Sequence, residues 1–239
     1  MIKKRVVFLL IHLFSMTILN AQETRKHSLS TDVTAQGLVG FNNTYEWYGG
    51  VDMKGVLHLD NTDFHLNVEA LTKNVYSMGL SVSTAFELCP DGFFFVDGTL
   101  HSRIFGDYKV YEFVYAASAG FRMRHFSVQL GCYMKTIDDL NRESHTLRSY
   151  IIEPFVPLYN LTISIMGFDN PWDVYLNGAN FNEFEYERMW APLCTLGGRW
   201  DFKDRWSMVA EGTLKPSGMF HATVKFYGAM LRIGVFYKL

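Results

Sequence analysis

Segments in which apolar and polar side chains alternate strictly recur along this chain, and they constrain its fold more than any other feature. In one such segment the apolar face consists of Tyr76, Met78, Leu80, Val82 and Phe86. The opposite face of the same segment consists of Ser77, Gly79, Ser81, Ser83 and Glu87. Because successive side chains of a β-strand point to opposite faces, this pattern predicts a strand with one apolar face.

The same alternation is present in residues 55–72, 109–123, 125–135 and 205–214. Segments of about ten residues with one apolar and one polar face are typical of transmembrane β-barrels, whose outer wall contacts lipid. A soluble β-sandwich also alternates and is the alternative fold, but it would have to cover these large apolar faces between two sheets. We therefore expect an all-β chain folded as an antiparallel, up-and-down transmembrane β-barrel.

The last ten residues alternate to the end of the chain. Their apolar positions are Leu231, Ile233, Val235, Tyr237 and Leu239. A strand of this kind predicts closure of the barrel by the final segment. The succession of a polar residue, a glycine, an aromatic residue and an apolar residue is formed by Arg232, Gly234, Tyr237 and Leu239.

This succession resembles the C-terminal assembly signal of bacterial outer-membrane β-barrel proteins. The resemblance is to the broad, porin-like class of Gram-negative bacteria and to no subfamily within it. It implies the cell outer membrane as the location, outer-membrane lipids as surroundings and the barrel assembly machinery as a partner.

The first 21 residues have the layout of an export signal. Basic residues at positions 3–5 precede an apolar stretch from Val6 to Leu19, and Ala21 provides a small residue for cleavage. The stretch is shorter than the roughly 20 apolar residues of a membrane-spanning helix. We expect residues 1–21 to be a signal peptide and residues 22–239 to form a single barrel domain.

The composition agrees with a barrel and excludes other classes. Charged residues make up 19% of the chain and aromatic residues 16%, whereas soluble domains carry about 25% charged residues. Abundant aromatic residues fit the aromatic girdles at the two rims of a barrel. The net charge of −2 predicts no nucleic-acid partner, and three widely spaced cysteines do not make a disulfide framework.

Turn residues divide the mature chain into about twelve strands, with ten or fourteen as alternatives. The predicted strands cover 28–40, 46–59, 63–73, 75–88, 93–105, 108–122, 125–135, 146–155, 158–168, 187–202, 205–214 and a last strand ending at 239. Pro154 to Pro157 is assigned to a turn, because proline cannot donate a hydrogen bond within a sheet.

Side chains assigned to the lumen include both signs of charge in similar numbers. The candidate lumen residues are Lys54, His58, His65, Glu69, Arg103, Glu112 and Glu211. Balanced charges favour ion pairs that fill a small barrel, whereas a selective pore tends toward one sign. We therefore predict a narrow channel or small-solute-binding barrel with a largely filled lumen and no cofactor.

A hairpin with its turn at Asn61-Thr62 would place His58 opposite His65 and Lys54 opposite Glu69. The two imidazoles are interpreted either as a proton or metal site or as a polar pair that fills the lumen. Two histidines without a third ligand do not define a metal site, so no metal is predicted.

Two long segments, 136–149 and 169–187, are predicted to be external loops. Asn177-Gly178 in the second is a typical type I′ turn and predicts a hairpin above the membrane. Aromatic residues lie beside carboxylates at Trp172, Asp173, Tyr175, Glu183 and Glu185. These would form a surface that binds a sugar or a divalent cation, or the loop would cover the barrel mouth.

The external loops support a second hypothesis, a structural or surface-interaction barrel that binds through its loops. A third hypothesis is a rim enzyme acting on lipid. The sequence contains no GxSxG, HExxH, CxxC or phosphate-binding glycine loop. His145 lies in one loop with Ser144 and Ser149, an arrangement that seldom makes a triad, so we predict no enzymatic activity.

Overall fold

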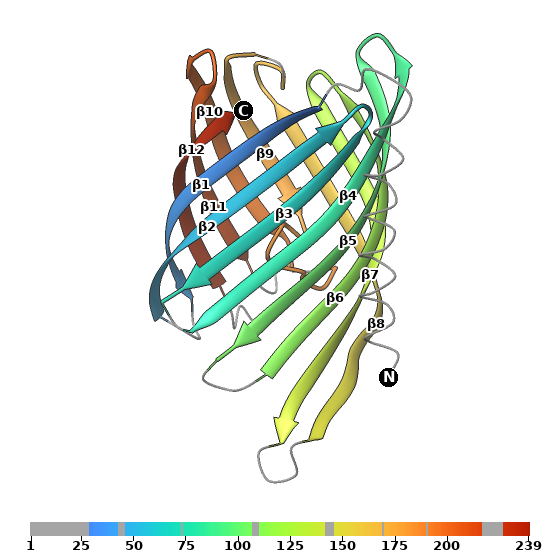
Figure 1. Cartoon of the computed structure of the whole chain (residues 1–239), viewed down its shortest axis with the longest axis vertical. Helices are drawn as coiled ribbons and strands as arrows, with labels where there is room; N and C mark the ends of the chain where they lie inside the picture. The colour runs from blue at the N-terminus through green and yellow to red at the C-terminus, as the bar shows by residue number, and fades with distance from the viewer. Residues whose placement is uncertain are drawn as a thin grey trace.

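The chain folds into a closed, antiparallel β-barrel of twelve strands (Figure 1). The computed structural model describes residues 29–42, 46–72, 74–106, 110–141, 146–168, 170–189, 191–216 and 227–239. The predicted signal peptide and its cleavage site lie outside these residues. The all-β barrel class predicted from the alternation is confirmed.

Each strand pairs with its neighbours in chain order, and the last pairs with the first. The strands are β1 (Leu29–Asn42), β2 (Glu46–Leu59), β3 (Thr62–Leu71), β4 (Val75–Cys89), β5 (Gly92–Phe105), β6 (Val110–Met123), β7 (Phe126–Asn141), β8 (Thr146–Ser164), β9 (Trp172–Ala179), β10 (Leu193–Lys203), β11 (Trp206–Pro216) and β12 (Tyr227–Lys238). Four of the five connections at the end that holds the C-terminus are two-residue turns. We call this end the short-turn end, which faces the periplasm in outer-membrane barrels.

β12 closes the barrel, as its alternation predicts. It pairs with β1 from Asp32–Lys238 to Asn42–Gly228. Leu231 and Ile233 are exposed on the outer wall, whereas Arg232 is buried inside. Gly234 is required by close packing, because a Cβ atom there would lie 2.3 Å from the carbonyl oxygen of Ala35.

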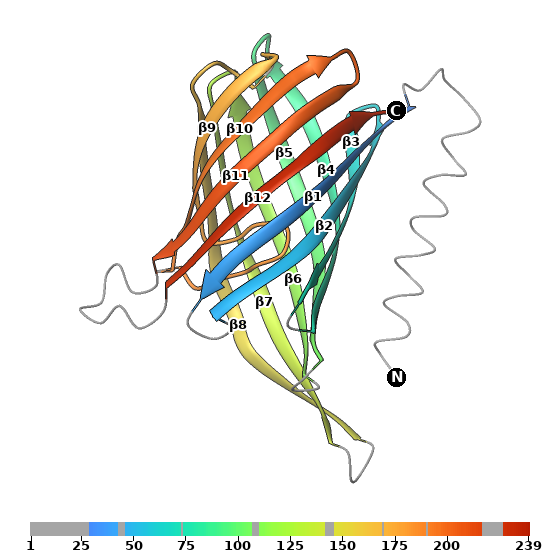
Figure 2. The same ribbon diagram turned by 90° about the vertical axis from the view of Figure 1, so that its left-hand side faces the viewer.

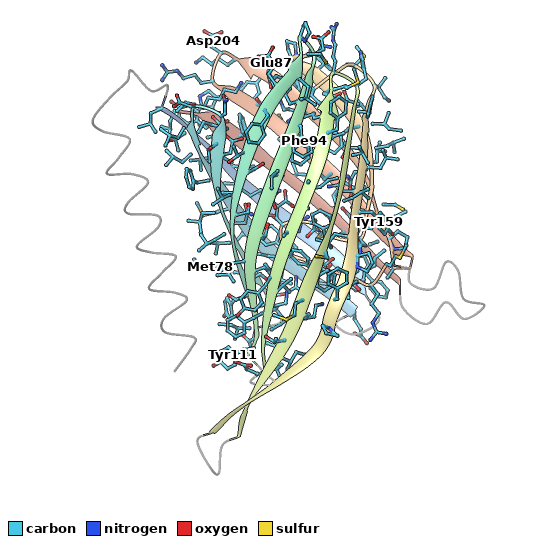
Figure 3. The ribbon with its side chains drawn as sticks, turned by 90° about the vertical axis from the view of Figure 1, so that its right-hand side faces the viewer. Met78, Glu87, Phe94, Tyr111, Tyr159 and Asp204 are labelled. Atoms are coloured by element: carbon cyan, nitrogen blue, oxygen red, sulfur yellow. The ribbon has the colours of Figure 1, made fainter. Side chains whose placement is uncertain are left out.

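The outer wall is apolar along the middle of the strands. Met78 and Phe94 are exposed on the outer wall, and Glu87 and Asp204 lie at the short-turn end (Figure 3). Aromatic rings cluster on the outer wall near that end, where Trp200 contacts Trp172 and Trp206 contacts Tyr237, with ring centroids 5.4 and 4.5 Å apart. Such a cluster is typical of an interfacial aromatic girdle. The described residues include no helix of the length and apolarity needed to cross a membrane.

The predicted turn at Pro154 to Pro157 is wrong, because both prolines lie inside the long strand β8. Two features make room for them. The pairing of β7 with β8 is irregular around Lys135, and β9 pairs with β8 only from Asn160 to Ser164. The missing proline N–H groups therefore fall where the ladder is incomplete. β8 replaces two predicted strands.

Neither segment predicted to be an external loop is mainly a loop. Asn177 and Gly178 pair with Thr195 and Cys194 within the wall, so they do not form a turn. Residues 172–179 therefore add strand β9, and the total remains twelve. β7 continues to Asn141 and β8 begins at Thr146, so most of the segment 136–149 is paired strand.

The predicted register of the β2–β3 hairpin is shifted by two residues. Its turn is the dipeptide Asp60-Asn61, with Asp60 in the left-handed region at φ 53°. His58 therefore lies opposite Asp63 and not His65, and Lys54 lies opposite Asn67 and not Glu69. Because side chains alternate with period two, this shift keeps every residue on its predicted face.

The free-energy cost of placing a charged side chain on the outer wall should depend on its depth in the bilayer. On β4, Leu80→Arg should destabilise the barrel by about 2–4 kcal/mol if it lies near the bilayer midplane, and Leu88→Arg, near the short-turn end, by about 0–1 kcal/mol. Urea unfolding of the protein refolded into lipid vesicles measures both. Equal costs at the two positions would contradict the membrane placement.

The observed register predicts which cysteine pairs can form a disulfide. In a variant with Cys89, Cys132 and Cys194 replaced by Ala, cysteines at His58 and Asp63 should crosslink, because directly opposed residues lie within disulfide range. Cysteines at His58 and His65 are diagonal, at roughly 7–8 Å, and should crosslink poorly. The reverse result, read from gel mobility after mild oxidation, would restore the Asn61-Thr62 turn.

Candidate functional site

The segment after β9 turns into the barrel instead of forming an external loop (Figure 1). We call residues 180–187 the lumen hairpin, since Phe181 pairs with Tyr186 across a tight turn. The side-chain oxygen of Asn182 accepts hydrogen bonds from the backbone N–H groups of Phe184 and Glu185, both at 2.8 Å. An asparagine that binds the backbone two and three residues ahead stabilises such a turn locally.

Asn180 fixes the base of the lumen hairpin to β8. Its side chain is fully buried. The Nδ2 atom donates to the carbonyls of Pro157 at 2.9 Å and Glu187 at 3.0 Å, and the Oδ1 atom accepts from the N–H of Tyr159 at 2.8 Å. These bonds occupy backbone groups of β8 beyond its pairing with β9, so the hairpin completes the ladder at the point where β9 ends.

One side of the lumen hairpin is apolar and packs on β6, β7 and β8. Tyr186 is 3% exposed and lies in a cluster with Val114, Tyr133 and Leu158. The centroids of the Tyr186 and Tyr133 rings are 5.6 Å apart in an edge-on arrangement. The ring of Phe181 stacks on the ring of Tyr186, with the centroids 5.8 Å apart. Aromatic burial of this kind holds the hairpin against one half of the wall.

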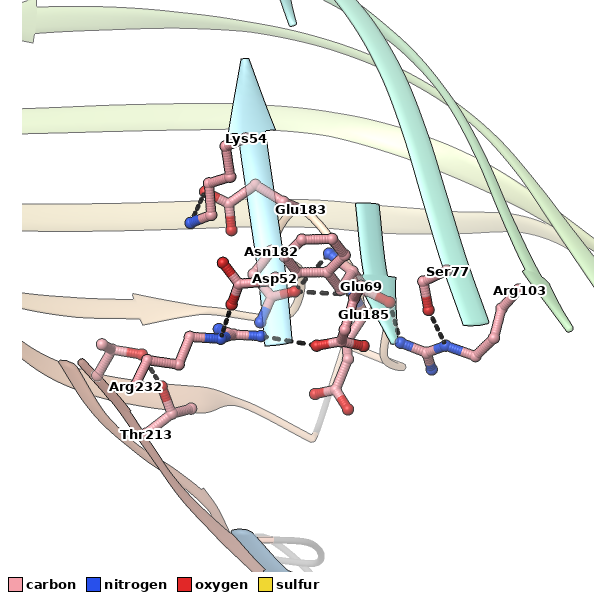
Figure 4. A network of polar contacts seen from close by, with 12 residues as sticks. Asp52, Lys54, Glu69, Ser77, Arg103, Asn182, Glu183, Glu185, Thr213 and Arg232 are labelled. Atoms are coloured by element: carbon pink, nitrogen blue, oxygen red, sulfur yellow. Dashed lines mark hydrogen bonds and ion pairs between the residues drawn. The ribbon is translucent and has the colours of Figure 1, made fainter. Parts of the chain in front are cut away.

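The other side of the hairpin is acidic and meets lysines of the wall. The Nζ atom of Lys54, on β2, lies 3.1 Å from Oε1 of Glu183 (Figure 4). Lys215, at the end of β11, forms an ion pair with Glu187. All four side chains keep partial exposure, so each pair contributes on the order of 1 kcal/mol or less.

Two further cations bind backbone carbonyls of the hairpin. The ammonium group of Lys135, on β7, donates to the carbonyl of Tyr186 at 2.7 Å. The guanidinium of Arg103, on β5, donates to the carbonyl of Phe184 and to the hydroxyl of Ser77. Cations from β2, β5, β7 and β11 therefore contact the hairpin in the lumen.

Arg232 lies at the centre of the charged side. Its Nε atom is 3.0 Å from Asp52 and its Nη2 atom is 3.2 Å from Glu69, and all three side chains are at most 4% exposed (Figure 4). The guanidinium carbon also lies 5.4 Å from the centroid of the Phe184 ring. This residue of the C-terminal pattern thus belongs to the lumen, and it joins the closing strand to β2, β3 and the hairpin.

The surroundings of the hairpin favour ionised glutamates. Burial works against ionisation of Glu183, but Lys54 and Arg232 outweigh it and lower the pKa of Glu183 to about 2. Burial likewise opposes ionisation of Glu185, and Lys215 and Arg103 outweigh it, so its pKa is also lowered. Both carboxylates are therefore charged at neutral pH and attracted to the wall.

The remaining candidate lumen residues form separate pairs. Glu112 lies 3.5 Å from Lys135, and Glu211 accepts a hydrogen bond from the hydroxyl of Tyr175. The ring nitrogens of His58 lie 2.7 Å from Asp63 and 3.0 Å from Asp32. His65 does not join them and lines a cavity. Among the described residues, no cluster of three ligands could hold a metal.

The predicted external binding surface does not exist as one site. Trp172 is on the outer wall, and Asp173 is buried inside, where it accepts a 2.5 Å hydrogen bond from Ser164. Tyr175 lies inside as well, and Glu183 and Glu185 belong to the lumen hairpin. The sequence did contain a signal of the inward position, since residues 183–187 alternate glutamate with aromatic residues and the lumen offers basic partners.

The lumen is not solid. A cavity of about 400 Å³ lies on the short-turn side of the hairpin, with Glu183 and Tyr186 in its lining. A second cavity of about 660 Å³ shares His65 and Phe95 with the first and reaches residues of the short turns, including Asp91. The hairpin thus lies in the lumen beside the first of two adjoining cavities.

Comparison with known proteins shows the fold and no subfamily. Neither a family model nor a curated protein sequence matches the chain. Among solved structures, the NanC porin has a TM-score of 0.51 at 11% identity over 86% of this chain and 100% of that one. The KdgM porin has a TM-score of 0.51 at 8% identity over 85% and 98%.

The translocator domain of the autotransporter NalP from Neisseria meningitidis has a TM-score of 0.50 at 12% identity, over 98% of this chain and 96% of that one. Identities this low establish the fold alone, which is that of the outer-membrane β-barrels. With its apolar outer wall, the chain is a β-barrel of the cell outer membrane.

The buried charges around Arg232 predict a large effect of a single substitution. Arg232→Ala should destabilise the barrel by about 3–5 kcal/mol, because Asp52 and Glu69 would stay buried without a partner. Adding Asp52→Asn and Glu69→Gln should recover part of the loss. The measurement is urea unfolding in lipid vesicles.

Arg199→Ala is the matched control, since its ion pair with Asp201 is partly exposed and should contribute about 1 kcal/mol or less. An Arg232→Ala variant as stable as this control would contradict the triad.

Proposed function

We propose that the protein is a narrow outer-membrane channel for small solutes, closed in this conformation by the lumen hairpin. The observation that carries the proposal is the way the hairpin is held. Part-exposed ion pairs of Lys54 and Lys215 and the carbonyl contacts of Arg103 and Lys135 hold it, and these are reversible contacts. A change in such polar contacts shifts a two-state equilibrium when the states differ by only a few kcal/mol.

The wall beside the hairpin also supports a channel rather than a permanently filled barrel. Small side chains such as Ser81, Ser83 and Thr99 line the cavity on the short-turn side of the hairpin. Gly79 lies against the hairpin itself, where a Cβ atom would be 3.3 Å from the carbonyl of Glu183. A barrel that only needed to be filled would place larger side chains there. Two of the structural neighbours are porins, which agrees with a channel.

A second candidate function is attachment to a partner through the surface. The observation that favours it is the β7–β8 hairpin, which projects beyond the rest of the rim (Figure 2). The rim-enzyme hypothesis depends on His145 together with Ser144 or Ser149 and Asp138 or Asp139. Ser144 and His145 lie outside the described residues, and we do not propose an enzyme. Insertion by the barrel assembly machinery remains part of the proposal.

Single-channel recording in a planar bilayer tests the closed channel. The unmodified protein should show little conductance, and a variant with residues 180–187 replaced by a Gly-Ser linker should show a steady current. A large steady current from the unmodified protein, or silence from a folded linker variant, would contradict the proposal.

A charge exchange tests how the hairpin is held. Lys54→Glu should raise the frequency of opening, because it places a carboxylate against Glu183, and the double variant Lys54→Glu with Glu183→Lys should reduce it again. Lys203→Glu is the matched control, since it makes the same charge change at the short-turn end of β10. If Lys203→Glu opens the barrel equally, the effect is one of general charge and not of the hairpin.

A further inference from the structure

We infer that the cavity on the short-turn side of the lumen hairpin binds a small neutral solute rich in hydroxyl groups, of the size and chemistry of a simple sugar. This inference rests on the proposed channel function, since it names the class of solute that the channel would carry. The cavity has a volume of about 400 Å³, within the roughly 300–1,000 Å³ of pockets that hold small ligands.

Neutral hydroxyl and carboxamide groups from several strands dominate the lining. They include Ser81, Thr99, Gln129, Asn160, Thr162 and Asn177. Hydroxyl and carboxamide groups both donate and accept hydrogen bonds, so they match a ligand whose own hydroxyls do the same. A solute without such groups would leave this lining unpaired, which costs free energy.

Part of this lining is held in place before any ligand binds. Nδ2 of Asn177, on β9, donates to Oδ1 of Asn160 at 2.6 Å and to the hydroxyl of Thr162 at 2.8 Å. The Thr162 hydroxyl also donates to Oδ1 of Asn160, at 3.2 Å. Side chains oriented in advance lose less entropy when a ligand binds.

Aromatic rings complete the site. Phe95, Tyr175, Phe181 and Tyr186 all line the cavity. The aliphatic C–H face of a sugar ring packs favourably on an aromatic ring, so a mixture of aromatic faces and neutral polar groups suits a molecule with both kinds of surface. Two of the four rings belong to the lumen hairpin, so a bound solute would contact the lumen hairpin itself.

The charges in the lining argue for a neutral ligand. The guanidinium of Arg232 is paired with Asp52 and Glu69, and Glu183 is paired with Lys54. The two remaining carboxylates also have partners. Glu211 accepts from the Tyr175 hydroxyl, and Asp97 accepts from the Thr99 hydroxyl at 2.8 Å. An anionic solute would have to displace one of these pairs, which opposes its binding.

Ligand titration of the full mature chain, refolded in detergent, tests the inference with glucose and maltose as neutral probes and glucuronate as the anionic probe. Saturation-transfer NMR reports contact, and competition with unlabelled probe gives the affinity. Saturable binding of a neutral probe, with glucuronate bound at least about tenfold more weakly, is the expected result.

Variants locate the site. Asn160→Leu and Gln129→Leu should each weaken binding by roughly three- to tenfold, the effect of one lost hydrogen bond. Thr84→Val is the control, because it removes a hydroxyl from the same barrel on a strand face away from the cavity, where Thr84 contacts Thr62. Two lining variants are used so that misfolding of one leaves the other informative.

Absence of saturable binding by glucose and maltose, as in a cavity that holds water only, would overturn the inference. Glucuronate bound as tightly as glucose, or binding unaffected in both lining variants, would overturn it too. The titration needs no current, so its failure is distinct from failure of the channel. If the linker variant conducts but no sugar binds, the channel proposal stands and the sugar inference is wrong. If a sugar binds but the linker variant does not conduct, the sugar inference stands and the channel proposal is wrong.

Discussion

The buried guanidinium of Arg232 connects the closure of the barrel to the contents of its lumen. It lies on the closing strand, reaches Asp52 on β2 and Glu69 on β3, and faces the ring of Phe184. Its two carboxylate partners lie opposite each other in the β2–β3 ladder. A charge at this depth is tolerated only when it is paired. Correct pairing of β12 with β1 therefore also brings the lumen hairpin's main cationic surface into position.

The lumen has two unlike halves, and the hairpin is built to contact both. β6, β7 and β8 present the apolar cluster that receives Tyr186, whereas the charged side of the lumen presents Lys54, Arg103 and Arg232 to the acidic side of the hairpin. Apolar packing favours a defined position, and part-exposed ion pairs add little to its stability. The proposed closed channel rests on a hairpin held in this way, which is packed against the wall and is not part of it.

The face of each strand could be predicted from the sequence, but the partners of its residues could not. Period-two alternation assigns Lys54, His58 and Glu69 to the lumen, and a shift of the register by two residues leaves them on that face. The choice between such registers depends on the turn, and here Asp60 adopts the left-handed region that allows a two-residue connection. Pro154 and the pair Asn177-Gly178 each predict a turn from the local sequence alone. Both predictions are wrong, because the incomplete β8–β9 ladder tolerates proline and because strand pairing on both sides of Asn177-Gly178 overrides its local turn preference. The hairpin could not be placed because its position depends on cations from five strands.

Solution NMR of residues 22–239 in detergent micelles tests the docked hairpin most directly. The guanidinium carbon of Arg232 lies 5.4 Å from the centroid of the Phe184 ring. We therefore expect nuclear Overhauser contacts between the ring protons of Phe184 and the side chain of Arg232. The Glu187 amide, which donates to the carbonyl of Asn180 at 2.7 Å, should exchange slowly with solvent. Contacts throughout the strands with none between the hairpin and the wall would contradict a lumen closed by residues 180–187.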